Sequence, residues 1–336
     1  MESRHQKPQL HYDGTEGACD IMEAVVQLYG GGSVVLAPLL EWETTLTGGV
    51  PCDSFYLKCP YHAAQAALLE RAWRVTLQEK GAVLLRAVVD ETEIVQNGAG
   101  RTLEISGRGL AALLLDNEAE AVTYTRPTLS ELLRRHAAPY GLSWGMFSEL
   151  QGQAEYSVSS GESQWRALEG FTRWVGGFVP RITAEGLLLP AAWKDNGRRF
   201  VIGAGTPLLE LRWQDRRYGV YSEVLVVDKV RRQRQRVKHT AFLDRGGCCR
   251  RVLYVPGRSS SAAMRYTGQY QIERSREGAR QLTAVLPGRQ GAAPGSVVRM
   301  EHSDIGIQGD FYVEEAAYCC NAAGETTTLR MRRLEE

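Results

Sequence analysis

The sequence has no long apolar run, no cysteine framework and no excess of charge of either sign. Its longest apolar segments, around residues 81–89 and 110–115, are far too short to cross a bilayer. The first residues lack the hydrophobic region of a secretion signal. We therefore predict a protein made and folded in a cytoplasm, without a membrane anchor. The net charge of +1 argues against a surface built wholly for nucleic acid or acidic lipid.

The seven cysteines are odd in number and do not follow the spacing of a disulfide-linked domain. Cys52 and Cys59 are too far apart for a zinc knuckle. The other spacings of interest are the adjacent pairs Cys248-Cys249 and Cys319-Cys320, and adjacent strand residues point to opposite faces. We therefore expect these thiols to act as small apolar packing residues. We expect no metal and no cofactor.

Hydrophobic residues make up 43% of the chain, which is enough for a packed core. Residues up to about 106 favour a compact antiparallel barrel or sandwich with one helix over 62–72. Turns are expected at Lys80-Gly81 and at Asn97-Gly98, where both residues tolerate positive φ. The segment Gly30-Gly31-Gly32 interrupts the first strands. The strands are expected over 21–28, 33–47, 73–78, 82–90, 93–96 and 101–106.

Residues 107–199 are typical of an α/β insertion with two helices. One helix opens at Pro127 and Thr128, and Glu131 completes the spacing of a capping box. Gly141 is placed where a left-handed residue ends a helix. A second helix is expected over 163–175, between a polar strand at 154–158 and a short hairpin at 178–189.

From residue 198 onward the pattern returns to strands, with one helix over 259–276. The apolar stripe expected on that helix consists of Ala263, Tyr266 and Tyr270. The strands are expected over 208–214, 218–230, 237–243, 251–255, 281–286, 296–301, 309–318 and 326–331. The fold class expected from the whole pattern is α+β, dominated by antiparallel sheet.

Four motifs could carry chemistry, and each has a plainer interpretation. Gly107-Arg108-Gly109 lacks the length and the Lys-Ser/Thr of a phosphate loop, so a tight turn is favoured. His136 lies on a helical face without metal-ligand spacing. The run Ser259-Ser260-Ser261 fits a helix cap better than a nucleophile elbow. The acidic pairs Glu118/Glu120 and Glu314/Glu315 could serve a glycosidase only at a defined separation across a cleft. We therefore predict no catalytic, cofactor-binding or metal-binding residues and no enzyme.

The most unusual local feature is the basic run from Lys229 to Lys238. If it is extended, Arg232, Arg234, Arg236 and Lys238 share one face. A solvated or subunit-facing hairpin, an acidic partner protein and a nucleic-acid backbone all fit such a run. The absence of interleaved aromatic residues for base stacking makes nucleic acid the least favoured of the three.

Several segments follow one another in a distinctive order along the chain. They are Ser-Gly-Arg-Gly-Leu at 106–110, Leu-Leu-Leu-Asp at 113–116, Tyr-Thr-Arg-Pro-Thr at 124–128, Ala-Pro-Tyr-Gly-Leu at 138–142, the alternating strand at 219–227, Gly-Asp-Phe-Tyr-Val-Glu-Glu at 309–315, the turn Ala323-Gly324 and Thr-Thr-Thr-Leu-Arg-Met at 326–331. This order resembles baseplate hub proteins of contractile phage tails and phage-tail-like bacteriocins, related to the phage late control D family. The resemblance covers most of the chain and rests on order and turn placement.

The resemblance implies a homotrimer with two tube-like antiparallel β-barrel domains per subunit and an α/β domain inserted in the first. The first barrel would span 1–106 and be completed by about 200–230, the insert 107–199 and the second barrel 231–336. Such a trimer is an adaptor that joins the hexameric inner tube, or a tube-initiator protein, to the trimeric central spike.

The tape measure protein is a further candidate partner, and nucleic acid is not expected. After assembly in the cytoplasm the protein would lie in a tail baseplate or in a released tail-like particle. The interface residues are unknown at this stage. The alternative function is a tail-tip peptidoglycan hydrolase that uses a carboxylate pair.

Overall fold

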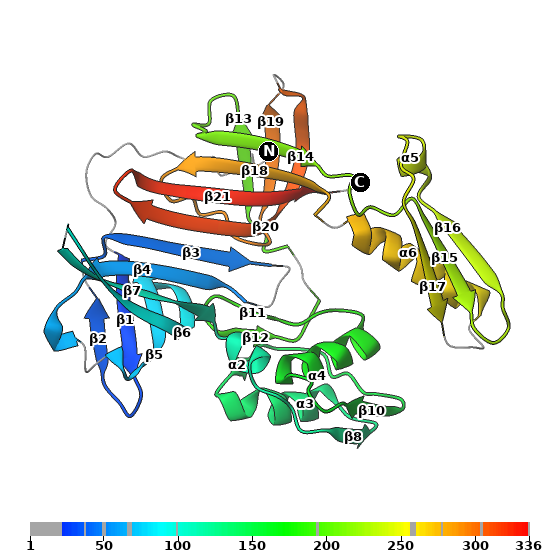
Figure 1. The fold of residues 1–336 in the computed structure, drawn as a ribbon, viewed down its shortest axis with the longest axis horizontal. Coiled ribbons are helices and arrows are strands. Elements are labelled where there is room, and N and C mark those ends of the chain that lie inside the picture. Colours follow the sequence, from blue (N-terminus) through cyan, green and yellow to red (C-terminus); the bar gives the residue numbers. More distant parts are fainter. Residues whose placement is uncertain are drawn as a thin grey trace, which may run out of the picture. The chain divides into compact units, whose positions relative to one another are not determined.

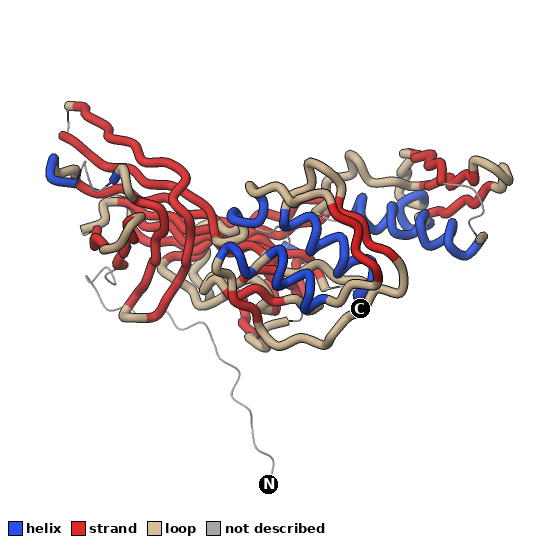
Figure 2. Tube along the Cα trace, turned by 90° about the horizontal axis from the view of Figure 1, so that it is seen from below, coloured by secondary structure: helices blue, strands red, loops and turns tan. Residues whose placement is uncertain are grey.

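The structure is a computed structural model that describes residues 22–334, except residues 37, 49–51, 66–68, 99, 193–194, 256–259, 277 and 303–304. Two compact units are present within these residues. Unit 1 extends to Leu209 and resumes over Val285–Arg330, and unit 2 contains Glu210–Ala284 and the residues from Met331. Strands dominate the trace and helices occupy a few segments (Figure 2). Most strand pairs are antiparallel, as the sequence predicts.

Unit 1 is organised by one long sheet, in the order β18-β21-β20-β3-β4-β7-β6-β5-β1-β2, with β19 beside β20 and β13 beside β19 (Figure 1). The N-terminal strands are β1 (Met22–Leu28), β2 (Ser33–Leu36), β3 (Glu41–Thr47), β4 (Ser54–Pro60), β5 (Ala72–Glu79), β6 (Ala82–Asn97) and β7 (Gly100–Gly109). The C-terminal strands are β13 (Arg199–Gly203), β18 (Arg280–Pro287), β19 (Val297–His302), β20 (Ile307–Asn321) and β21 (Gly324–Arg333).

The pairing of β20 with β3 joins the two ends of the described chain in this sheet, with Glu315 opposite Thr47. Side chains alternate between the two faces of each strand. On the inner face Trp42, Phe55 and Leu103 are buried. The core of the sheet is therefore built from every second residue of strands that are distant in sequence.

Two glycine-containing turns form as expected. Gly30, Gly31 and Gly32 all have positive φ between β1 and β2. Lys80 (φ 49°) and Gly81 (φ 80°) connect β5 to β6, which gives the twist that a two-residue hairpin needs. The strands predicted separately over 82–90 and 93–96 are one continuous strand, β6, which bends at a bulge near residue 90.

The insert begins directly after β7 and contains the helices of unit 1. Its elements are α2 (Ala112–Leu115), β8 (Val122–Thr125), α3 (Leu129–His136), the 3₁₀ turn η2 (Ala138–Tyr140), β9 (Ser143–Trp144), β10 (Glu155–Val158), α4 (Gln164–Phe171), the π-helical turn η3 (Thr172–Gly176), β11 (Arg181–Ile182) and β12 (Leu187–Leu189). Helices α3 and α4 pack against each other, and β8 pairs with β10 (Figure 1).

Both main helices of the insert have the ends that the sequence predicts. The Thr128 hydroxyl accepts a hydrogen bond from the Glu131 N–H at 3.2 Å. The Ser163 hydroxyl accepts one from the Arg166 N–H at the same distance. Gly141 follows η2 with φ 71°. The apolar stripes of the two helices form one core, whose fully buried side chains include Leu129, Leu132, Leu133, Leu168 and Phe171. Local capping and core packing agree here, so the insert was predictable.

Unit 2 contains a separate three-stranded sheet with the order β16-β15-β17. Its elements are β14 (Glu210–Asp215), β15 (Glu223–Asp228), β16 (Arg234–Lys238), the short helix α5 (Thr240–Leu243), β17 (Arg250–Val255) and α6 (Ser261–Arg276). The strand β14 is the sheet neighbour of β18, which begins in this unit. Val224 and Val226 of β15 pack against Met264 and Ile272 of α6, so the helix covers one face of the sheet (Figure 1).

Three predicted elements differ from the structure. Of the helix expected over 62–72, the structure describes the 3₁₀ turn η1 (Ala63–Gln65) and a helical residue at Leu69; residues 66–68 lie outside the described residues, and Ala72 already belongs to β5. The strand expected over 237–243 ends at Lys238, and α5 follows. The stripe expected on α6 is wrong: Tyr266 and Tyr270 are exposed, whereas Met264, Gly268 and Ile272 are buried.

Gly268 explains why α6 buries a different side from the one that its sequence pattern predicts. A Cβ at this position would lie 2.5 Å from the Val237 side chain, so only glycine permits the close approach of helix and sheet. The boundary expected at residue 231 lies in the turn between β15 and β16, inside unit 2. The strands of residues 200–230 pair with β19, β18, β16 and β17.

Candidate functional site

The junction between β7 and the insert is set by two glycines. Asp90 is the extra residue of a bulge in β6, opposite residues 106–107 of β7. A Cβ on Gly107 would lie 2.0 Å from the Val88 carbonyl oxygen, and one on Gly109 would lie 3.3 Å from the Asp53 side chain. The glycines of the Ser-Gly-Arg-Gly motif therefore allow backbones to approach closely at the bulge. All three residues of Gly107-Arg108-Gly109 belong to strand β7, so the tight turn expected at this motif begins only at Leu110.

Arg108, between these glycines, is fully engaged by two carboxylates. Its Nε lies 2.7 Å from Asp90 Oδ2, and its Nη2 lies 2.6 Å from Asp116 Oδ2. Hydrogen bonds to Asp90 and Asp116 raise the pKa of Arg108, and the bond from Arg108 lowers the pKa of Asp116. A guanidinium held in two charge-assisted pairs has little capacity left for phosphate. It links the bulge to the turn that follows α2.

Asp53 is a buried carboxylate at the same junction, with 8% of its surface exposed. Its Oδ1 accepts a hydrogen bond from the Thr47 N–H at 2.7 Å, and its backbone carbonyl accepts one from the Gly109 N–H at 2.8 Å. Burial raises the pKa of Asp53 to about 6, against the lowering effect of the two Thr47 hydrogen bonds. Nothing in the sequence singled out this residue.

His136 lies 2% exposed in the core of the insert. Its Nε2 is 2.9 Å from the Tyr124 hydroxyl, and its Nδ1 is 2.6 Å from Gln164 Oε1. The Gln164 amide donates in turn to the Glu118 carbonyl at 3.0 Å. Burial lowers the pKa of His136, so the neutral ring is favoured. The histidine therefore stabilises the insert as a hydrogen-bonded core residue, which is the interpretation favoured from the sequence.

No disulfide joins the cysteines that the structure describes. The Cys52 thiol donates to the Gly109 carbonyl over 3.5 Å, and burial raises its pKa to about 11. Burial also raises the pKa of Cys59 and of Cys319. These groups are thiols at neutral pH and hence poor nucleophiles. Across the described ranges no group of His, Cys, Asp and Glu side chains has the arrangement of a metal site.

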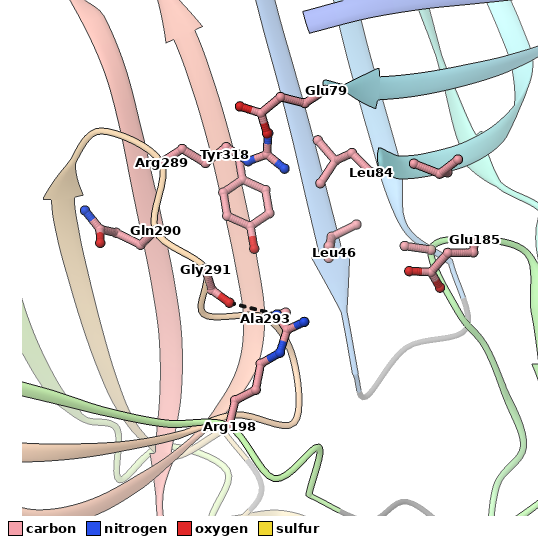
Figure 3. Close-up of a pocket in the computed structure, with 12 residues that line it drawn as sticks. Leu46, Glu79, Leu84, Glu185, Arg198, Arg289, Gln290, Gly291, Ala293 and Tyr318 are labelled. Carbon is pink, nitrogen blue, oxygen red and sulfur yellow. Dashed lines mark hydrogen bonds and ion pairs between the residues drawn. The ribbon is translucent and has the colours of Figure 1, made fainter. Parts of the chain in front are cut away.

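A polar cavity of about 420 Å³ lies in unit 1, between the β5–β6 turn and the loop that follows β18 (Figure 3). Arg289 forms an ion pair with Glu79, and its guanidinium carbon lies 5.5 Å from the centroid of the Tyr318 ring. The Tyr318 hydroxyl donates to the Ala292 carbonyl at 2.8 Å. Arg198 donates to the Gly291 carbonyl at 3.1 Å. These contacts connect two segments distant in sequence.

The cavity offers no activated nucleophile among its described lining residues. Burial raises the pKa of Tyr318 to about 12, so its phenol stays protonated at neutral pH. The Glu79 carboxylate faces the Arg289 guanidinium (Figure 3). Glu185 lines the cavity from the β11–β12 turn. Sequence reasoning missed Glu79, Arg289 and Tyr318 because each lies in an ordinary strand or loop pattern.

The acidic pairs considered from the sequence lie elsewhere. Glu118 and Glu120 are exposed, and Glu120 pairs with Arg135 at 3.5 Å. Glu315 is 2.9 Å from Arg330. Neither pair lines the cavity. In the serine run, residue 259 lies outside the described residues, whereas the Ser260 hydroxyl accepts from the Ala263 N–H at 3.1 Å and caps α6. This confirms the capping role.

The basic run forms a turn followed by strand β16. Arg232 has φ 55° and lies in the turn, so it does not continue the face formed by Arg234, Arg236 and Lys238. Those three side chains alternate with partly buried ones along β16 and are exposed. Arg236 lies 3.5 Å from Glu223 of the neighbouring strand. The run is therefore the outer row of a sheet face.

No helix in the described part of the chain is long and apolar enough to span a membrane.

No protein-family model matches the chain, and no curated protein matches it. Solved structures share its fold. The tail protein from Neisseria meningitidis MC58 aligns with a TM-score of 0.71 at 17% identity, over 92% of this chain and 96% of that chain. The 43 kDa tail protein of prophage MuSo2 from Shewanella oneidensis aligns with a TM-score of 0.73 at 15% identity, over 93% and 98%.

A Francisella PdpA–VgrG complex in its lidded form aligns with a TM-score of 0.59 at 7% identity, over 93% of this chain and 52% of that chain. The alignments with the two tail proteins extend over nearly the full length of both partners, so the order of elements is shared as well as their type. The chain has the fold of phage tail proteins, as its resemblance to baseplate hubs implies.

Proposed function

We propose that this chain is the structural baseplate hub of a contractile tail-like particle. It acts as a homotrimeric adaptor that joins the hexameric inner tube, or a tube-initiator protein, to the trimeric central spike. The observation that carries the proposal is the tail-protein fold over nearly the whole length of both aligned chains. The likeness to a PdpA–VgrG complex supports a spike protein of the VgrG kind as the partner.

The arrangement of the elements supports an assembly role. The chain leaves the long sheet of unit 1 after Gly109 to form the insert, and a buried core with capped helices stabilises that insert. We further propose that each subunit has two tube-like domains, one built on the N-terminal strands and one on residues 231–336. Three copies with two such domains each would present six similar units to a hexameric tube and three-fold symmetry to a spike.

The protein performs this role without turnover. A hydrolase would need an acid and a nucleophile or base facing a substrate cleft, whereas Glu79 in the cavity is bound by Arg289. Zymography on peptidoglycan tests this directly. Clearing by the purified chain that disappears in Glu185→Gln, with Glu120→Gln as the control outside the cavity, would favour the hydrolase over the hub.

The test of the hub is an electron-microscopy reconstruction of the assembled particle. We expect three copies of this chain between the last tube ring and the spike. Sedimentation with purified spike protein should give a complex of three chains with three spike subunits. The proposal would be refuted if the chain lies on the sheath or the fibres, or if it binds neither tube nor spike proteins.

A further inference from the structure

The sheet of unit 2 has one covered and one open face. On the covered face Val224, Val226 and Val237 lie beneath α6. The pairing of β15 with its neighbours places the alternate residues of all three strands on the opposite face. None of the described elements of unit 2 packs on that face, which we call the basic face. It consists of Glu223, Leu225, Val227, Arg234, Arg236, Lys238, Arg250, Val252 and Tyr254.

The basic face has cations on one side and apolar residues on the other. Arg234, Arg236 and Lys238 lie along the edge strand β16, and Arg250 lies at the start of β17. Leu225 and Val227 are half-buried, and the outward Val252 and Tyr254 beside them are 43% and 64% exposed. The face has four cations and a single carboxylate, Glu223. That carboxylate is already occupied, because Arg250 Nε lies 2.7 Å away and Arg236 Nε lies 3.5 Å away. The remaining positive charge, on Arg234 and Lys238, has no ion pair among the described residues of the chain. An acidic surface is the complementary partner.

The same chain carries such a surface on unit 1. On the outer face of β3, β4, β6 and β7, carboxylates occupy two neighbouring rows of cross-strand pairs. One row runs Glu93–Glu104–Lys58–Glu41, and the next runs Glu91–Ser106–Tyr56–Glu43. The only cation in these rows, Lys58, is bound to Glu104 at 3.2 Å. We call this surface the acidic face. Burial, with Glu104, Glu41 and Glu93, raises the pKa of the central Tyr56.

The two faces match in spacing as well as in sign. Alternate residues along a strand are about 7 Å apart. Arg234, Arg236 and Lys238 follow that spacing on β16, and Glu91 and Glu93 follow it on β6. Glu43, Glu91 and Glu93 are exposed. A strand of one face laid over a strand of the other could therefore bring two neighbouring cations of β16 opposite Glu91 and Glu93.

We propose that the basic face of one copy docks on the acidic face of a second copy. Because the two surfaces differ and lie on the same chain, the contact is heterologous and can close into a ring. The inference rests on the proposed homotrimer and assigns its interface. Leu225, Val252 and Tyr254 would form the apolar part of the contact, and the charge pairs would set orientation and register.

The test is a charge swap in the full chain, with sedimentation velocity in 50 mM NaCl as the measurement. The basic-face variant is Arg236→Glu with Lys238→Glu, and the acidic-face variant is Glu91→Lys with Glu93→Lys. Each should weaken self-association by about 100-fold or more, since two attractive pairs become repulsive. The chain carrying all four changes should return to within about 10-fold of the native affinity, because the faces are complementary again.

The matched control is Arg217→Glu with Arg265→Glu, which reverses two exposed cations outside the basic face. It should self-associate like the native chain, and circular dichroism should show that all variants keep their fold. The variant with all four substitutions keeps the test decisive if a single-face variant unfolds. The proposal would be overturned if self-association is unchanged in both single-face variants, if the variant with all four substitutions does not recover the native affinity, or if the native chain stays monomeric.

A second measurement is zero-length crosslinking of a mixture of light and heavy chains. We expect a link from Lys238 to Glu91 or Glu93 that joins a light peptide to a heavy one. Links found only within one chain would contradict the interface. A native trimer that is indifferent to the charge swap refutes this interface and leaves the hub standing, whereas a charge-sensitive trimer absent from the baseplate refutes the hub alone.

Discussion

Asp53 gives a prediction that follows from burial alone. The carboxylate is 8% exposed and accepts hydrogen bonds from Thr47, yet its pKa is raised to about 6. The folded chain therefore binds a proton more tightly at Asp53 than the unfolded chain does. Stability from this group is fully present below the unfolded pKa of about 3.9 and is lost as the pH rises through about 6.

A shift of about 2 pKa units corresponds to about 3 kcal/mol between the two protonation states. Between pH 4.5 and pH 7.5 the unfolding free energy should fall by about 2 kcal/mol through this group. Asp53→Asn keeps the acceptor for the Thr47 N–H and removes the titration. The unfolding free energy of the variant should therefore not show this decrease, and the variant should become more stable relative to the native chain as the pH rises.

The assay is urea unfolding followed by tryptophan fluorescence at several pH values from 4.5 to 7.5. The quantity compared is the difference between native chain and variant, because His136 titrates in the same window with the opposite sign. The control is Asp310→Asn, which removes an exposed carboxylate of unit 1. Parallel pH profiles for the native chain and Asp53→Asn would refute the reasoning.

Three further changes test the insert and its junction by the same urea measurement. Gly107→Ala should cost about 3 kcal/mol or more, because its Cβ would meet the Val88 carbonyl oxygen, whereas Gly98→Ala has open space and should be nearly neutral. His136→Phe leaves the buried Tyr124 hydroxyl and the half-buried Gln164 amide without their hydrogen bonds and should cost about 2–4 kcal/mol. It should also remove the loss of stability that accompanies protonation of this low-pKa imidazole as the pH falls below about 6.5. Thr128→Ala removes the cap of α3 and should cost about 1 kcal/mol, with Thr128→Ser as the control that keeps it.

Each of these three stability predictions has a measurable outcome that would contradict it. Equal stability of the Gly107 and Gly98 variants would mean that the bulge relaxes around a methyl group. A His136 variant that keeps the native pH dependence would place the titration elsewhere. A Thr128→Ala chain as stable as Thr128→Ser would show that the cap is replaced by solvent.

Sequence alone determined the features that depend on neighbouring residues. Capping at Thr128 and Ser163 and the hairpin at Lys80-Gly81 follow from chemistry within a few positions. The stripe of Leu129, Leu132 and Leu133 follows from helical period in the same way. The order of elements also follows from the sequence, and with it the resemblance to tail proteins.

Tertiary structure decided what depends on distant partners. The pairing of β20 with β3 brings together strands from the two ends of the chain. The buried side of α6 is set by how closely Gly268 lets the helix approach Val237, which its own pattern does not contain. A net charge of +1 likewise conceals a basic face on one unit and an acidic face on the other. Composition gives only the sum of the charges. The register of the strands decides which charged side chains share a face and can form a binding surface.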